Sequence, residues 1–390
     1  MKAPPILARV FRGPRVESAH RGSAAVVDER GALLASCGDA ALPVYTRSAA
    51  KPFQAMPLLL AGGEKRYRLS DADIALICAS HGGEPRHTAL AAQLLKKGGF
   101  AVSDLECGAH LPMHDASARA LIRAGKPPTA LHNNCSGKHA GMLLACRLLG
   151  LPHAGYTDPA HPLQRRIRSL LAVYGGVPES QITVAVDGCN APVFRLPLSA
   201  LALSYARLTA DKVPGEERSA ASVRGRIVRA IVRRPEMIAG AGRFTTDLVA
   251  AGRGRWIGKE GAEGVYAVAL SPDRRGRSTG IAFKIEDGSA RARDAVTLAL
   301  LSRLDAMTTS RNQRVATAEG WSGAGGRTRT GTTLRSGDFE SPASAIPPLR
   351  RGDEEDTRSG GRAIACVQRR VGEGQAGPAY RYSHSERRQS

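Results

Sequence analysis

Ser48-Ala49-Ala50-Lys51 places a hydroxyl and an amine three residues apart, at the start of a helix predicted over residues 48–60. On a helix this spacing stacks the two side chains on one face. A buried, neutral lysine can then take the proton of the serine, which is the minimum equipment of a hydrolase that forms an acyl-enzyme. The tetrapeptide alone is weak evidence, because a serine helix cap followed by a solvated lysine is common.

Hydrophobic patterning around this stretch predicts an α/β fold. Two apolar runs, 23–27 and 32–37, flank an Asp-Glu-Arg-Gly turn and predict a hairpin. Residues 265–270 and 280–286 predict a second hairpin, and 182–186 a short buried strand. Helical spacing dominates the middle of the chain, at 71–78, 85–97, 116–124, 138–149, 162–174, 198–208, 217–233 and 290–307. The pattern favours an antiparallel sheet covered by helices over a doubly wound nucleotide-binding fold, which needs βαβ alternation.

Composition divides the 390-residue chain in two. Residues 1–307 are predicted to form one catalytic domain, while residues 308–390 contain no lysine and are rich in Arg, Gly and Ser. A segment with no sustained apolar period cannot offset its chain entropy by burial. We therefore expect residues 308–390 to be a disordered tail, or a non-native end produced by read-through.

The net charge of +21 suggests nucleic acid as a partner, but the other features argue against it. Aromatic residues make up only 4% of the chain, and the arginines are scattered rather than gathered on one helix. A basic nucleic-acid-binding protein without enzymatic activity is nevertheless the non-enzyme alternative. Apolar runs are too short for a membrane span and the N-terminus lacks a secretory signal pattern, so we expect a cytoplasmic protein. Seven cysteines indicate reduced thiols or metal ligands.

Lysine is used sparingly, since only ten of the 56 basic Lys and Arg residues are lysines. Because lysine can lose its proton when buried and arginine cannot, a lysine in a Gly-rich or Ser-rich turn is a candidate for chemistry. Lys51, Lys138 and Lys259 all meet that description.

Four further segments carry candidate chemistry, and each also has an ordinary structural explanation. In 78–84, Ser80 lies beside Gly82 and Gly83, whose N–H groups could hold an oxyanion, although a helix C-cap is the simpler interpretation. Cys135, in 132–139, lies at a predicted helix N-terminus, which favours a thiolate. Cys189 follows a strand in a polar turn. Lys259 lies in a predicted turn, 258–264, where a solvated lysine is the commoner outcome.

Taken together these segments resemble the asparaginase II family, the Rhizobium-type L-asparaginases, whose fold is similar to serine β-lactamases and penicillin-binding proteins. The resemblance spans about residues 5–306. It rests on five motifs in the family's order: Thr46-Arg47-Ser48-Ala49-Ala50-Lys51-Pro52, Ser80-His81-Gly82-Gly83-Glu84, Asn133-Asn134-Cys135-Ser136-Gly137-Lys138-His139-Ala140-Gly141, Val186-Asp187-Gly188-Cys189 and Gly258-Lys259-Glu260-Gly261-Ala262-Glu263-Gly264.

The resemblance implies a set of site residues and a cofactor. It implies two Ser/Lys pairs, a zinc ion with water as a further ligand, substrate contacts and a homodimer. The pairs are Ser48 with Lys51 and Ser80 with Lys259; the zinc ligands are Cys135, Lys138 and Cys189; the substrate contacts are Arg47, His139 and Asp187.

The expected reaction is hydrolysis of L-asparagine to L-aspartate and ammonia. Ser48 attacks the side-chain amide, Lys51 acts as the base, and Ser80 with Lys259 relays protons. Zinc is expected to position the substrate rather than to generate the nucleophile. The enzymatic alternative is a serine β-lactamase or D,D-peptidase, but the chain lacks their Ser-x-Asn and Lys-Thr-Gly elements at the expected places.

Overall fold

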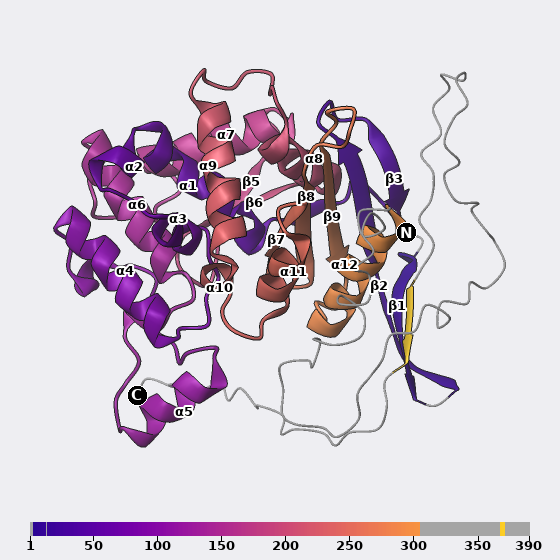
Figure 1. Ribbon diagram of the computed structural model, residues 1–390, viewed down its shortest axis with the longest axis horizontal. Helices are drawn as coiled ribbons and strands as arrows, with labels where there is room; N and C mark the ends of the chain where they lie inside the picture. The colour runs from indigo at the N-terminus through magenta and orange to yellow at the C-terminus, as the bar shows by residue number, and fades with distance from the viewer. Residues whose placement is uncertain (1–2, 13, 305–366, 371–390) are drawn as a thin grey trace, which may run out of the picture.

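The computed structural model describes residues 3–12, 14–304 and 367–370 and contains a large antiparallel sheet, with most of the helices to one side of it (Figure 1). The strand order is β10-β1-β2-β9-β8-β7, with β3 paired to β2, and every pair except parallel β1–β10 is antiparallel. The strands are β1 (Ile6–Arg12), β2 (Arg15–Asp28), β3 (Leu33–Cys37), β7 (Trp256–Glu260), β8 (Val265–Leu270), β9 (Thr279–Ile285) and β10 (Val367–Arg370).

Helices cover both faces of this sheet. On one face, α11 (Phe244–Gly252) and α12 (Ala290–Arg303) enclose a core that includes Trp256, Tyr266 and Phe283. On the other face, α8 (Leu198–Thr209) packs on β2, β8 and β9. The approach of α8 is so close that a Cβ at Gly280 would collide with the carbonyl oxygen of Ala202. Glycine at this position of β9 therefore fixes the distance between helix and sheet.

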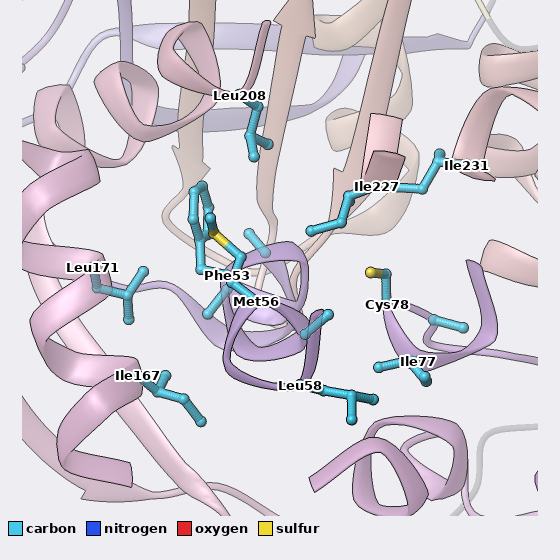
Figure 2. Packing of buried hydrophobic residues seen from close by; sticks show 14 of the residues in the cluster. Phe53, Met56, Leu58, Ile77, Cys78, Ile167, Leu171, Leu208, Ile227 and Ile231 are labelled. Atoms are coloured by element: carbon cyan, nitrogen blue, oxygen red, sulfur yellow. The ribbon is translucent and has the colours of Figure 1, made fainter. Parts of the chain in front are cut away.

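A helical layer beside the sheet is built around α1 (Lys51–Leu60). Figure 2 shows Phe53 and Met56 of this helix surrounded by apolar side chains from α3 (Asp71–Ile77), α7 (Pro162–Gly175) and α9 (Ala220–Arg233). Nine of its ten residues are buried, which explains why α1 tolerates an internal Pro57. The remaining helices are α2 (Gly63–Arg66), α4 (Pro85–Gly98), α5 (Asp115–Arg123), α6 (Ser136–Leu149) and α10 (Pro235–Ile238).

A second, three-stranded sheet has the order β4-β6-β5, with β4 (Pro43–Tyr45), β5 (Thr183–Val186) and β6 (Pro192–Pro197). The prediction of a buried strand over 182–186 is right in position and wrong in burial. β5 is an edge strand with no fully buried residue, and Val186 is 63% exposed. An apolar run therefore did not guarantee burial here.

The predicted antiparallel sheet covered by helices is confirmed, as are the hairpins β2–β3 and β8–β9. The placement of Lys259 in a turn is wrong, because it lies on β7 and the turn begins at Gly261. No helix in the described part of the chain is long and apolar enough to cross a membrane. The predicted tail, 308–390, lies outside the described residues apart from β10, so its disorder and origin stay predictions.

Candidate active site

Lys51 enters the protein interior from a strained turn. Arg47, at the start of the short 3-10 helix Arg47–Ala50, has φ of +47°, a left-handed conformation that costs energy for a residue with a Cβ. The 3-10 helix leads directly into α1, whose first residue is Lys51. The Lys51 side chain is 1% exposed, and its Nζ donates to the carbonyl oxygen of Ala79 at 2.5 Å and lies 2.9 Å from Ser80 Oγ.

Ser80 receives a second amine from a distant part of the chain. Lys259 Nζ lies 2.9 Å from Ser80 Oγ and also donates to the carbonyl oxygen of Glu260 at 2.9 Å. The Ser80 backbone N–H donates to the carbonyl oxygen of Ile238, which holds the segment after α3 in place. One buried hydroxyl therefore lies between two buried amines that come from α1 and β7.

Ser48 has a different environment. It is half-buried, whereas Ser80 is 5% exposed. Among the described residues, no hydrogen bond joins the Ser48 hydroxyl to Lys51; the lysine amine is directed at Ser80 instead. The structure thus brings Lys51, Ser80 and Lys259 together, with Ser48 three residues before Lys51 on the more exposed side of the group.

Lys259 differs from an ordinary lysine in its charge state. Burial, together with the positive charges of Lys51 and Arg243, lowers the pKa of Lys259 to about 7, although the Glu260 carboxylate opposes the change. A neutral amine at this pKa can accept a proton near physiological pH, which is the property required of a general base.

Two thiols and an amine form a second cluster. Cys135 caps α6, Lys138 lies one turn later, and Cys189 lies in the turn between β5 and β6. All three are buried, and Lys138 Nζ lies 3.0 Å from Cys189 Sγ. A side-chain hydrogen bond from Cys189 lowers the pKa of Cys135 well below its usual range, against the effect of burial, and the charges of Lys51 and Lys138 add to the shift. The cluster is therefore coupled to Lys51.

These donors suit zinc in type. Thiolates and a neutral nitrogen are ligands that zinc accepts, and an adjacent buried histidine offers a further nitrogen. Against the effect of burial, the charges of Cys189 and Cys135 raise the pKa of Lys138, so this lysine must lose a proton to bind the ion. His139 Nε2 is buried with no hydrogen-bond partner in the described chain, while its Nδ1 is 2.7 Å from the Tyr156 hydroxyl. Among the described residues, no group of three or more His, Cys, Asp and Glu side chains is placed to hold a metal ion, so the proposed set depends on the lysine.

Two of the predicted substrate contacts, Arg47 and Asp187, lie at the rim of the site, whereas the third, His139, is fully buried. Arg47 Nη2 forms a salt bridge with Asp187 Oδ1 at 2.8 Å, and both side chains are partly exposed. The pair offers one positive and one negative group at the same place. An α-amino acid has the complementary pair, an ammonium and a carboxylate.

The glycines after Ser80 are only partly available as oxyanion donors. The Gly83 N–H already donates to His81 Nδ1 at 3.1 Å. Gly82 accepts at its carbonyl oxygen from the His114 N–H, and its own N–H has no partner in the described chain. The prediction that both glycines hold an oxyanion therefore needs correction for Gly83, because a neighbouring imidazole occupies that donor.

His81 is a residue that sequence reasoning did not assign. Burial and the charges of His87 and Lys51 lower the pKa of His81 well below its usual range, so the ring is neutral. Because Nδ1 accepts from Gly83, Nε2 carries the proton and donates to Ser136 Oγ at 2.9 Å. His81 thus ties the Ser80 segment to the start of α6, which carries the thiol cluster.

Comparison with known proteins gives one extensive match. A family model described as L-asparaginase II matches residues 8–333. No curated protein matches the chain.

Solved structures of other proteins are only loosely similar to the structure of this chain. A protein called Mglu in its native form is 16% identical, with a TM-score of 0.42 over 75% of this chain and 67% of that one. A β-lactamase from Mycobacterium bovis is 16% identical, with a TM-score of 0.37 over 72% and 94%. A Bacillus glutaminase is 12% identical, with a TM-score of 0.33 over 73% and 89%. At TM-scores this low, neither the β-lactamase activity nor the glutaminase activity is assigned to this chain.

Proposed function

Because the chain belongs to the L-asparaginase II family of amidohydrolases, we propose that it hydrolyses the side-chain amide of L-asparagine to give L-aspartate and ammonia. The observation that carries the proposal is the Ser80 hydroxyl, held 2.9 Å from both the Lys51 and the Lys259 amines in a buried site. Acyl transfer needs a base of suitable pKa and a path for protons beside the nucleophile, and this group of residues offers both.

We assign the nucleophile to Ser48. Its hydroxyl is more exposed than that of Ser80 and is not engaged by either lysine, so it is free to meet a substrate. Attack on the amide carbon forms the ester bond as the Ser48 proton passes to Lys51, whose amine contacts Ser80 in this structure and has to turn toward Ser48 to accept that proton. The C–N bond then breaks, and the leaving nitrogen receives a proton through Ser80 and departs as ammonia. Water attacks the β-aspartyl ester and releases aspartate.

Binding of the amino acid is assigned to the rim. Arg47 suits the α-carboxylate and Asp187 the α-ammonium group, while the neutral His139 is buried beside the thiol cluster. Two opposite charges select a zwitterionic amino acid over a plain amide. The assignment predicts that removing either charge weakens binding more than it slows the chemical step.

Asp187→Asn is expected to raise KM for asparagine about 10–100-fold with kcat nearly unchanged, since a charge-assisted hydrogen bond is worth about 1.5–3 kcal/mol. Initial rates over a range of asparagine concentrations measure both constants. Asp211→Asn, on an exposed aspartate, is the matched control. A fall in kcat of about 10–100-fold with KM unchanged would contradict a binding role for Asp187.

A zinc ion is proposed at Cys135, Lys138 and Cys189. When bound, it would supply a fixed positive charge beside the site and link α6 to the β5–β6 turn. These three residues would hold the ion, while the nucleophile and bases remain the Ser/Lys group.

Cys135→Ala is expected to reduce the zinc content of the purified protein from about one ion per chain to below about one-tenth, because a zinc site rarely survives loss of a thiolate ligand. Elemental analysis after desalting gives the content. Cys146→Ala removes another buried cysteine outside the cluster and should leave the zinc content unchanged. If both variants bound the same amount of zinc, the zinc site would not be formed by Cys135, Lys138 and Cys189.

The decisive assay for the function is ammonia release by the full chain. Asparagine, glutamine and a chromogenic cephalosporin should be offered in parallel, with rates followed by an enzyme-coupled ammonia assay and by absorbance. Release from asparagine alone or preferentially supports the proposal. Cephalosporin hydrolysis without ammonia release would replace it with the β-lactamase alternative. A homodimer is proposed on the family resemblance and is tested by sedimentation. A cytoplasmic location, the expectation drawn from the sequence, is tested by cell fractionation.

A further inference from the structure

Strand β7 carries two charged residues in succession, Lys259 and Glu260. Successive side chains on a strand point to opposite faces, so the lysine faces Ser80 while the glutamate faces the layer formed by α11 and α12. Both side chains are buried, at 1% and 5% exposure. A buried carboxylate is costly unless it is paired, which raises the question of what it contributes here.

The Glu260 carboxylate is held by two arginines from separate elements. Arg243, the residue before α11, places Nη2 2.5 Å from Glu260 Oε1. Arg293, on α12, places Nη1 3.6 Å from Oε2, an oxygen that makes no hydrogen bond within the described residues. The ladder between β7 and β8 already fixes the strand, since Lys259 pairs with Ala267 and Glu260 with Tyr266. The ion pairs are therefore not needed to define the path of β7.

We propose that Glu260 and Arg243 form a charge pair behind the Lys259 amine and that the balance of these two charges sets the charge of Lys259. Both are positioning residues, because neither touches the Ser80 hydroxyl. The carboxylate favours the ammonium form of Lys259 and the guanidinium disfavours it. This inference rests on the proposed function only in the experiment that measures asparaginase activity; the lysine titration is independent of it.

The other titratable groups near Lys259 lie at the start of α1, at the start of α6 and at the end of α3. Lys51 at the start of α1 disfavours the ammonium form, and Cys135 at the start of α6 favours it. Cys78, at the end of α3, stays a neutral thiol because burial raises its pKa to about 12. Glu260 and Arg243 are the two charges that can be altered without touching either the proposed zinc ligands or the Ser/Lys group.

Replacing Glu260 and replacing Arg243 are expected to shift the midpoint of the Lys259 titration in opposite directions. Glu260→Gln removes a negative charge and should lower the midpoint of the Lys259 titration by about one pH unit, whereas Arg243→Gln should raise it by a similar amount. The double variant should return toward the wild-type value. Arg293→Gln removes the other guanidinium that contacts the same carboxylate, and it should move the midpoint least.

The titration is measured directly by NMR of protein labelled with [ε-13C]lysine. The ten lysines give few signals, and Lys259→Arg identifies the one in question. Opposite shifts for Glu260→Gln and Arg243→Gln support the proposal, even if no ammonia is released from asparagine. Shifts in the same direction, or none, in variants whose thermal unfolding is cooperative overturn it. If asparaginase activity is present, the acid limb of kcat/KM should move with the NMR midpoint.

Discussion

Replacing Ser48 with alanine is expected to reduce kcat for asparagine hydrolysis by about 10⁴-fold or more, the largest effect foreseen for a single substitution in this chain. Without the nucleophile no ester forms, and the remaining groups can only assist direct attack by water. Asparagine binding should survive, because the rim pair Arg47 and Asp187 is untouched. Rates are measured by ammonia release and binding by calorimetry.

Labelling identifies which serine forms the ester. An asparagine analogue with a diazo ketone in place of the side-chain amide should add to Ser48, and peptide mass spectrometry locates the adduct. Ser80→Ala is the matched variant: it removes a proton relay held by two amines, so kcat should fall by about 10²–10⁴-fold while Ser48 still becomes labelled. An adduct on Ser80 in the wild type, with Ser48→Ala labelled equally, would exchange the two roles.

Local signals in the sequence were sufficient to predict much of the helical part of the fold. Ser70 and Asp73 form the capping box that starts α3, and Gly99, with φ of +70°, ends α4. The helices predicted around these residues are confirmed within a few positions. Such signals act through neighbours on the chain, so the sequence exposes them directly.

The strands that carry the site depend on partners far along the chain. The assignment of Lys259 to a turn failed because Gly258 and Gly261 dominate the local sequence, whereas pairing with β8 makes the segment a strand. The same limit applies to the apolar run at β5, whose burial depends on which strand lies beyond it.

The candidate site shows a similar division. Motif order alone was enough to select Ser80 and both lysines, and the fold brings those three together. The contact of Lys51 with Ser80, and not with the serine three residues before it, follows from how α1 packs against the end of α3. The partnership of Glu260 with Arg243 had no signal in sequence spacing, since 17 residues and a helix separate them.

Replacing Lys51 with methionine or with arginine is expected to reduce kcat by about 10²–10⁴-fold in both cases. Methionine fills the buried space without an amine. Arginine keeps a positive charge and the capacity to donate to Ser80 Oγ and to the Ala79 carbonyl oxygen, but it cannot lose its proton in a protein. Equal losses therefore indicate that Lys51 must accept a proton.

The pair of variants separates this role from a purely structural one. If Lys51 served only as a cationic donor, Lys51→Arg would retain much more activity than Lys51→Met, and the base would have to be Lys259. Lys65→Arg, on an exposed lysine, is the control for the exchange itself and should leave kcat unchanged. Zinc content and thermal unfolding are measured on every variant, because Lys51 also influences Cys135. A rate loss with normal zinc content and cooperative unfolding then belongs to proton transfer at Lys51 and not to damage in the thiol cluster.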